Sequence, residues 1–178
     1  MKIEFRKLQR KESNSYRELR LECLKMFPEN FGSNYQDEKE KDKLFFQPYI
    51  ENSSTDNFLI GGFDNEKLIA ICGFHRYEAE KTKHRGTIIQ VYVNPEYQGK
   101  NIGLDILKST LNKAFQKDGI EQIELGVVTT NGGAEKIYKK IGFNEYGVQK
   151  NYLKIGNKYF DHKMMVIYAN QYNPQEIL

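Results

Sequence analysis

Cysteine is scarce in this sequence, and long apolar runs are absent. The two cysteines, Cys23 and Cys72, are isolated and lack metal-ligand spacing, so we expect no metal site. No apolar stretch approaches the length of a membrane span, and the N-terminus lacks the apolar segment of a signal peptide. We therefore expect a cytoplasmic protein with no membrane partner.

A strong charge of either sign is absent as well. The chain carries 27 basic and 24 acidic side chains, a net charge of +3. Nucleic-acid binders usually cluster many more cations, so we expect no nucleic-acid partner. The apolar content of 39% and the aromatic content of 13% are typical of a globular protein. We expect one domain over residues 1–178, with a loosely ordered tail at 170–178.

Two common phosphate-binding motifs are missing, the Walker loop and the Gly-x-Gly-x-x-Gly fingerprint. The chain does contain a strand, a loop and a helix in succession. Residues 87–93 are mostly β-branched or aromatic, as in a buried strand, and Asn94-Pro95 ends that run. The loop 98–103 leads into a helical periodicity over residues 104–115. The unpaired N–H groups of such a helix start attract phosphate.

The loop has a recognisable spacing. Gln98, Asn101 and Gly103 follow a strand that ends in Val-x-Val, and this pattern resembles the pyrophosphate loop of the GNAT N-acetyltransferases. In that family the loop reads Arg or Gln, two residues, Gly, one residue, then Gly or Ala. Asn101 thus replaces the first glycine. Asparagine tolerates left-handed dihedral angles better than other non-glycine residues, so we expect the turn to be kept.

A second segment resembles the same family. Asn131, Ala134, Tyr138 and Gly142-Phe143 match its Asn-x-x-Ala-x-x-x-Tyr-x-x-x-Gly-Phe spacing. Asn131 is a good helix N-cap and Gly142 a good residue just past a helix end. Asn131 and Tyr138 are about two helical turns apart and so point the same way. Both motifs occur in the expected order and on the expected elements.

The pattern of elements predicts an α+β fold. The expected strands cover residues 3–8, 57–63, 67–77, 87–93, 122–128, 143–149 and 159–168. The expected helices run from Ser13 or Ser15 to Pro28, over roughly 36–50, after the 98–103 loop, and from Asn131 to Gly142. The resemblance implies the GNAT acetyltransferase fold, in which a central mixed, mostly antiparallel sheet of about seven strands is flanked by about four helices.

The resemblance also implies acetyl-CoA as co-substrate. In the family two strands splay apart, and the pantetheine arm pairs with main-chain groups at a strand end, here Val91, Tyr92 and Val93. The pyrophosphate would bind the main-chain N–H groups of the loop and helix start. These N–H groups belong to Gln98, Gly99, Lys100, Asn101, Ile102 and Gly103. Lys100 is expected either to add a charge near the phosphates or to be a solvated surface lysine. Asn131 would bond the pantetheine arm in addition to capping its helix.

The implied activity is direct transfer of an acetyl group to a primary amine in a ternary complex. The reaction requires a neutral amine, a stabilised oxyanion, a proton for the thiolate and partial exclusion of water. A main-chain N–H near residues 91–93 is the expected oxyanion donor. Tyr138 is the expected general acid to sulfur, and plain packing against the sheet is the alternative for this side chain.

No general base follows from the sequence. The two positions where family members carry a glutamate are Thr87 and Gly126 here, so neither assignment transfers. Four other titratable residues near strand ends are more simply explained as solvated, namely His75, Glu78, Glu80 and His84. A bound water is a further candidate for carrying the proton.

The acceptor is equally open at this point. Phe31 and Tyr35 are candidates for lining its pocket, and a small amine, a polyamine, an amino sugar and a protein amine are all compatible, as is a homodimer. A CoA-binding sensor without turnover is the alternative function, and consumption of acetyl-CoA in the presence of amines separates the two. A nucleic-acid binder using the basic flanks near residues 75–85 is a third candidate, which requires strongly salt-dependent binding.

Overall fold

A computed structural model of the chain describes residues 2–173 and residue 175. Seven strands and five α-helices make up most of this part of the chain. The strands are β1 (Ile3–Lys7), β2 (Phe58–Asp64), β3 (Lys67–Arg76), β4 (Arg85–Val93), β5 (Gln122–Val128), β6 (Asn144–Ile155) and β7 (Lys158–Tyr168). The α-helices are α1 (Ser13–Met26), α2 (Tyr35–Glu40), α3 (Gln47–Glu51), α4 (Ile102–Phe115) and α5 (Gly132–Ile141). The short 3-10 helices are η1 (Arg10–Glu12), η2 (Pro28–Asn30), η3 (Pro95–Tyr97) and η4 (Ala169–Gln171).

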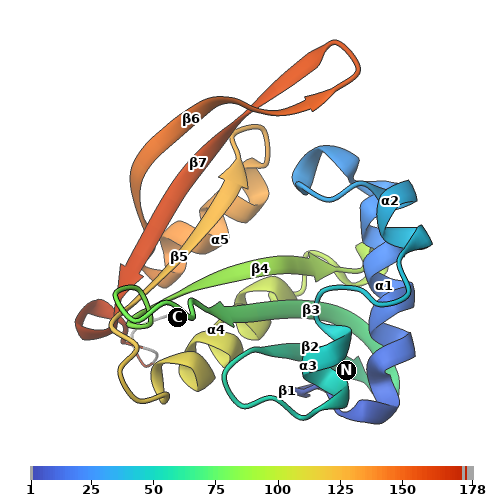
Figure 1. Cartoon of the computed structure of the whole chain (residues 1–178), viewed down its shortest axis with the longest axis horizontal. Helices are drawn as coiled ribbons and strands as arrows, with labels where there is room; N and C mark the ends of the chain where they lie inside the picture. The colour runs from blue at the N-terminus through green and yellow to red at the C-terminus, as the bar shows by residue number, and fades with distance from the viewer. Residues whose placement is uncertain (1, 174, 176–178) are drawn as a thin grey trace.

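The strands form a single mixed sheet in the order β1-β2-β3-β4-β5-β7-β6. The pair β4–β5 is parallel, and every other neighbouring pair is antiparallel. The parallel pair needs a crossover connection, which α4 provides on one face of the sheet. The predicted seven-stranded, mostly antiparallel sheet is confirmed (Figure 1).

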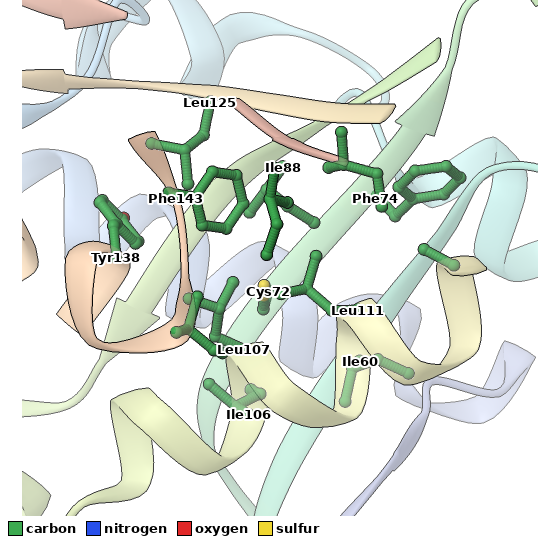
Figure 2. Packing of buried hydrophobic residues seen from close by; sticks show 14 of the residues in the cluster. Ile60, Cys72, Phe74, Ile88, Ile106, Leu107, Leu111, Leu125, Tyr138 and Phe143 are labelled. Atoms are coloured by element: carbon green, nitrogen blue, oxygen red, sulfur yellow. The ribbon is translucent and has the colours of Figure 1, made fainter. Parts of the chain in front are cut away.

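Helices cover both faces of the sheet. Successive side chains of a strand point to opposite faces, and β2 shows this clearly. Its Leu59 packs in the apolar cluster beneath α1 and α3, whereas Ile60 packs in the cluster beneath α4 and α5. Figure 2 shows the second cluster, in which buried Cys72 lies among side chains from the sheet and α4. Cys72 is fully buried.

The sheet opens between β4 and β5. The two strands pair over only three residues each, where Arg85, Gly86 and Thr87 lie opposite residues 122–124. Beyond this point β4 continues beside β3, and β5 continues beside β7. Figure 1 shows β4 and β5 diverging from their junction. The expected splaying of two neighbouring strands is therefore present.

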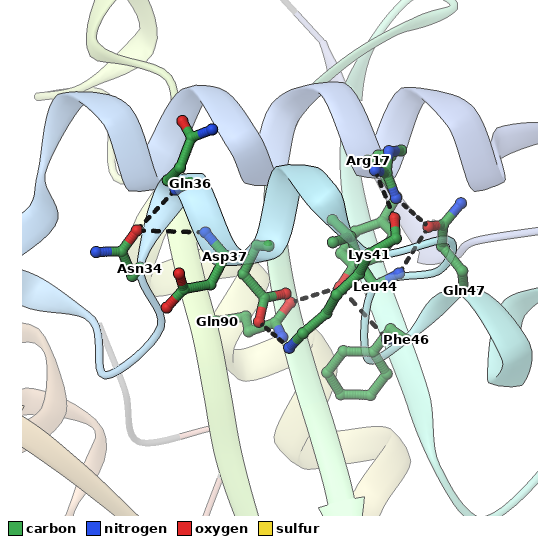
Figure 3. A network of polar contacts seen from close by, with 11 residues as sticks. Arg17, Asn34, Gln36, Asp37, Lys41, Leu44, Phe46, Gln47 and Gln90 are labelled. Atoms are coloured by element: carbon green, nitrogen blue, oxygen red, sulfur yellow. Dashed lines mark hydrogen bonds and ion pairs between the residues drawn. The ribbon is translucent and has the colours of Figure 1, made fainter.

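The helix predicted over residues 36–50 is wrong as one element, because it is divided into α2 and α3. The chain becomes extended at Lys41 (φ −71°, ψ 141°). The Arg17 guanidinium donates to the main-chain carbonyls of Lys39 and Lys41 at 2.9 and 2.8 Å, which holds the end of α2 (Figure 3). The break lets Leu44 and Phe46 turn into the core. The described residues therefore form five α-helices, where about four were expected.

The last two strands form a hairpin longer than predicted. β6 continues to Ile155, well past the expected end at residue 149, and β7 begins at Lys158, close to the expected start at residue 159. Gly156 at the turn has φ of 57°, a left-handed conformation that glycine adopts without strain. The register of the pair shifts between Gln149 and Leu153. The extra length brings Tyr152 of β6 to the region where β4 and β5 separate.

The predicted loose tail begins at residue 170, and part of it is anchored. Tyr172 packs on Phe115 with ring centroids 5.2 Å apart and donates to the Asn112 side chain at 2.8 Å. Residues 174 and 176–178 lie outside the described residues. Among the helices that are described, none is long and apolar enough to cross a membrane.

Candidate active site

A cavity of about 1090 Å³ lies where β4 and β5 separate. Ordinary ligand pockets measure roughly 300–1,000 Å³, so this cavity has room for an extended ligand beside a small second one. Most of the predicted site residues line it: Phe31, Val91, Tyr92, Val93, Gln98, Gly99, Asn101, Ile102, Gly103, Asn131 and Tyr138. The structure thus brings together two motifs that are separated in the sequence by a helix and a strand.

Lys100 and Tyr35 are not among the lining residues. The Lys100 ammonium lies 5.3 Å from the centroid of the Tyr97 ring and donates to the Glu96 carbonyl at 3.4 Å. Its position matches that of a solvated surface lysine. Tyr35 is the first residue of α2, and its ring is approached by Lys39 at 6.0 Å.

The edge of β4 carries unpaired main-chain groups into the cavity. After Thr87 no strand pairs with the β5-facing edge of β4 in the described part of the chain. A β-bulge lies in the same stretch, because two residues, Gln90 and Val91, stand opposite the single residue Cys72 of β3. Gln90 has a left-handed φ of 58°, and its side chain accepts a hydrogen bond from the Tyr16 hydroxyl at 2.9 Å. Bulges re-aim local groups next to functional sites, and α1 holds this one in place.

The loop between η3 and α4 has the geometry of an anion site. Gly99 and Asn101 both have positive φ, 76° and 61°, so the left-handed conformation expected at Asn101 is confirmed. The Asn101 side chain makes no capping hydrogen bond to α4. The Gln98 side chain donates to the Val93 carbonyl at 3.2 Å and ties the loop to β4. The first N–H groups of α4 therefore remain available to an anion.

Helix α5 contributes Asn131 and Tyr138. The Asn131 side chain accepts from the Ala134 N–H at 3.2 Å as an N-cap, which leaves its NH₂ group free to donate. Gly142 ends α5 with φ of 110°, so both predicted helix boundaries are confirmed. Tyr138 is 7% exposed, and burial raises the pKa of its phenol above the ordinary value. The hydroxyl makes no hydrogen bond to a described residue and stays protonated at neutral pH.

Aromatic rings from the segments that follow α1 and α2 form another wall of the cavity. Phe27, Phe31 and Phe45 line the cavity there, together with the charged residues Arg20 and Glu38. Glu124 and Gly126 of β5 also line the cavity. The three rings give this wall an apolar part beside its charged residues.

Glu124 is a carboxylate already held by several donors. Arg85 contacts it at 2.8 Å, Tyr77 donates to it in a short hydrogen bond, and Tyr146 donates at 3.4 Å. Burial and the nearby carboxylate raise the pKa of Tyr77. Arg85, Tyr77 and Tyr146 therefore already occupy the carboxylate oxygens of Glu124.

His162 of β7 lines the cavity and was missed by the sequence analysis. Its imidazole lies over Gly126, where a Cβ atom would come within 1.9 Å of Cε1. The Tyr152 ring stacks on it with centroids 4.1 Å apart. Nδ1 is buried and hydrogen-bonds no described residue, and burial lowers the pKa below its usual 6.5. His162 is therefore a neutral imidazole at pH 7, able to accept a proton.

The four titratable residues considered from the sequence do not line this cavity: His75, Glu78, Glu80 and His84. A glycine inside a strand signals close approach of another group, so Gly126 was the available clue to His162. Over the described residues, no three His, Cys, Asp or Glu side chains gather as metal ligands would.

Comparison with known proteins places this geometry in a family. The family model described as "Acetyltransferase (GNAT) family" matches residues 17–143. A Bacillus subtilis protein assigned as a ribosomal protein bS18-alanine N-acetyltransferase is 27% identical over 80% of this chain and 88% of its own. The Bacillus subtilis N-acetyltransferase YjcK is 23% identical over 68% of this chain. The chain spans 66% of the length of YjcK and 55% of a second curated relative.

A solved structure shares the fold. The acetyltransferase yncA from Salmonella typhimurium, solved with its cofactor acetyl-CoA, superimposes with a TM-score of 0.77 at 13% identity. The match covers 94% of each chain.

Proposed function

The chain belongs to the acetyltransferase (GNAT) family, and we propose that it transfers the acetyl group of acetyl-CoA to a primary amine by direct attack in a ternary complex. One observation carries this proposal: the opening between β4 and β5 joins an uncapped helix start, unpaired strand groups and a protonated tyrosine in one cavity. An anion site and a proton donor that line the same cavity fit an acyl-phosphopantetheine donor. Acetyl-CoA supplies the acetyl thioester when it is bound.

The chain's own residues fit such a donor. The N–H groups of residues 101–103 would bind the pyrophosphate, and the free edge of β4 at Val91, Tyr92 and Val93 would pair with the pantetheine amides. The Asn131 NH₂ group is free to bond the same arm. A main-chain N–H beside the Gln90 bulge would donate to the carbonyl oxygen as negative charge develops on it.

Two side chains would move protons. The amine nitrogen forms the new N–C bond while the C–S bond breaks. In this proposal His162 accepts the proton that the amine loses, and Tyr138 gives its phenolic proton to the sulfur. Both side chains line the cavity, and the environment of each favours the form that its step requires: a neutral imidazole and a protonated phenol.

Thiol release from acetyl-CoA in the presence of an amine panel tests the proposed function. Release that depends on one class of amine, with the acetylated product identified by mass spectrometry, is the expected result. Acetyl-CoA binding without release by any amine in a broad panel would instead favour a CoA-binding sensor. Similarity to yncA, which was solved with acetyl-CoA, supports the choice of cofactor. Similarity to the Bacillus subtilis ribosomal protein bS18-alanine N-acetyltransferase supports the reaction class.

Replacing Gly103 with phenylalanine should weaken CoA binding about tenfold or more, equivalent to roughly 1.4 kcal/mol. A Cβ at this position already meets Ile137 Cδ1 at 3.2 Å, and the larger ring would cover the helix-start N–H groups. Calorimetric titration with CoA measures the effect. Gly147→Phe is the matched control, because a Cβ there meets nothing within 4 Å and Gly147 does not line the cavity. Unchanged affinity in Gly103→Phe would count against the loop assignment.

Neither Cys23→Ser nor Cys72→Ser should abolish transfer. Both thiols are buried, and burial raises the pKa of each to about 12, so neither is an available thiolate nucleophile at neutral pH. Steady-state thiol release by the two purified variants checks this. Complete loss of transfer in a folded variant would instead point to an acyl-cysteine intermediate.

A further inference from the structure

Arg20 of α1 is a buried cation for which the transfer reaction has no use. Its residue is 3% exposed, yet it lines the cavity. Nε is buried and hydrogen-bonds no described residue. Nη1 donates only to the Cys23 sulfur at 3.6 Å, which is a weak acceptor. The guanidinium carbon lies 4.7 Å from the centroid of the Phe31 ring.

These contacts do not compensate a buried charge. A guanidinium cannot lose its proton in a protein, so it needs acceptors. The Phe31 ring offers a cation–π contact but no hydrogen-bond acceptor. The two carboxylates that line this part of the cavity are paired elsewhere: Glu38 contacts Lys41 at 2.6 Å, and Glu124 contacts Arg85 at 2.8 Å. The Arg20 guanidinium therefore has no oxygen acceptor among the described residues.

The position of Arg20 indicates which ligand would supply that partner. It lines the cavity together with Phe27, Phe31 and Phe45. It comes from α1, which packs on the opposite face of the sheet from α4, the helix that the phosphate loop leads into. The ligand that contacts Arg20 in this part of the cavity is therefore the amine acceptor and not CoA. Arginine presents a planar fork that matches a carboxylate in a bidentate pair.

We propose that Arg20 binds a carboxylate of the acceptor, so that the substrate is a small amine that also carries a carboxylate, such as an amino acid with an apolar side chain. The apolar part would lie against the aromatic wall. A polyamine would instead bring further cations toward an unpaired guanidinium, which disfavours it. This inference rests on the proposed function and specifies its acceptor.

Paired probes that differ only by the carboxylate test the assignment. Methionine is compared with 3-(methylthio)propylamine, and phenylalanine with phenethylamine, in the thiol-release assay. Wild-type protein should show kcat/KM about 100-fold higher for the carboxylated member of each pair. Arg20→Met should remove this preference while leaving kcat/KM for the plain amine within about threefold. Lys25→Met is the matched control, since it removes an exposed charge from the same helix.

A binding measurement covers the case in which these probes turn over slowly. N-acetylmethionine is titrated calorimetrically into the protein–CoA complex, and Arg20→Met should weaken its binding at least tenfold, with CoA affinity unchanged. If Arg20→Met does not fold, Arg20→Lys is used instead, because it keeps the charge but not the planar guanidinium. Arg20→Lys should lower kcat/KM about tenfold for the carboxylated probes only.

The outcomes separate this inference from the proposed function. Equal turnover of both members of each pair by wild type, or a preference that survives in Arg20→Met, would overturn the carboxylate assignment and leave acetyl transfer standing. Absence of N-acetylmethionine binding together with absence of probe turnover would overturn it too. Absence of CoA binding by wild type would overturn both.

Discussion

Tyr138→Phe is expected to lower kcat about 100-fold while leaving the affinity for CoA nearly unchanged. General acid catalysis contributes roughly 10²- to 10⁴-fold, and thiolate is a good leaving group, so the low end applies. The substitution removes only the hydroxyl, which bonds no described residue, and the ring keeps its edge-on contact with Phe143 at 6.1 Å. Steady-state thiol release and calorimetry with CoA measure the two quantities.

Tyr172→Phe is the matched control for this experiment. It removes a hydroxyl that bonds Asn112 at 2.8 Å and does not line the cavity, so kcat should not change. The melting temperature of Tyr138→Phe should stay close to that of wild type, because no hydrogen bond is lost. Undiminished turnover in Tyr138→Phe would leave this tyrosine a packing residue.

His162→Gln should lower kcat/KM about 100-fold at pH 7.5, because a positioned base is lost. Burial holds the pKa of this imidazole below 6.5, so wild type keeps the neutral, proton-accepting form at pH 6.5 and above. The ratio of wild-type to variant kcat/KM should therefore be constant above about pH 6.5 and fall as the pH drops through the lowered pKa. A pH profile of both proteins records this.

Two further variants complete the test of His162. Gly126→Ala places a Cβ where Cε1 of His162 now lies and should produce a similar loss by displacing the imidazole. His84→Gln, at a histidine that does not line the cavity, should have little effect. A ratio near one at every pH for His162→Gln would show that another group, or water, accepts the proton.

The parts of the fold that the sequence predicts are those set by local chemistry. Asn101 and Gly142 adopt the left-handed angles that their residue types tolerate, and the strand of residues 87–93 follows from its β-branched run. The break between α2 and α3 depends instead on Arg17 binding main-chain carbonyls and on the burial of Leu44 and Phe46. Such distant contacts override a local preference for one continuous helix.

The site residues also fall into two groups, those that local spacing predicts and those that depend on tertiary packing. The loop at residues 98–103 and the α5 motif each follow from spacing within one segment, and both line the cavity. His162 reaches its position from β7 across Gly126 of β5, and Arg20 comes from a helix with no motif of its own. Their placement depends on strand order and on helix packing, which residue spacing within one segment does not encode.

The measurement that most directly tests the central claim is the melting temperature of the purified protein with acetyl-CoA, with CoA and with NAD. A ligand that binds only the folded state at 100 times its Kd stabilises it by about 2.7 kcal/mol. We predict a clear rise with both CoA species and none with NAD, because the helix start and the free β4 edge fit a pantetheine diphosphate. No stabilisation by either CoA species would contradict the account, and Asn101, which replaces the glycine of the loop pattern, would be the first residue to examine.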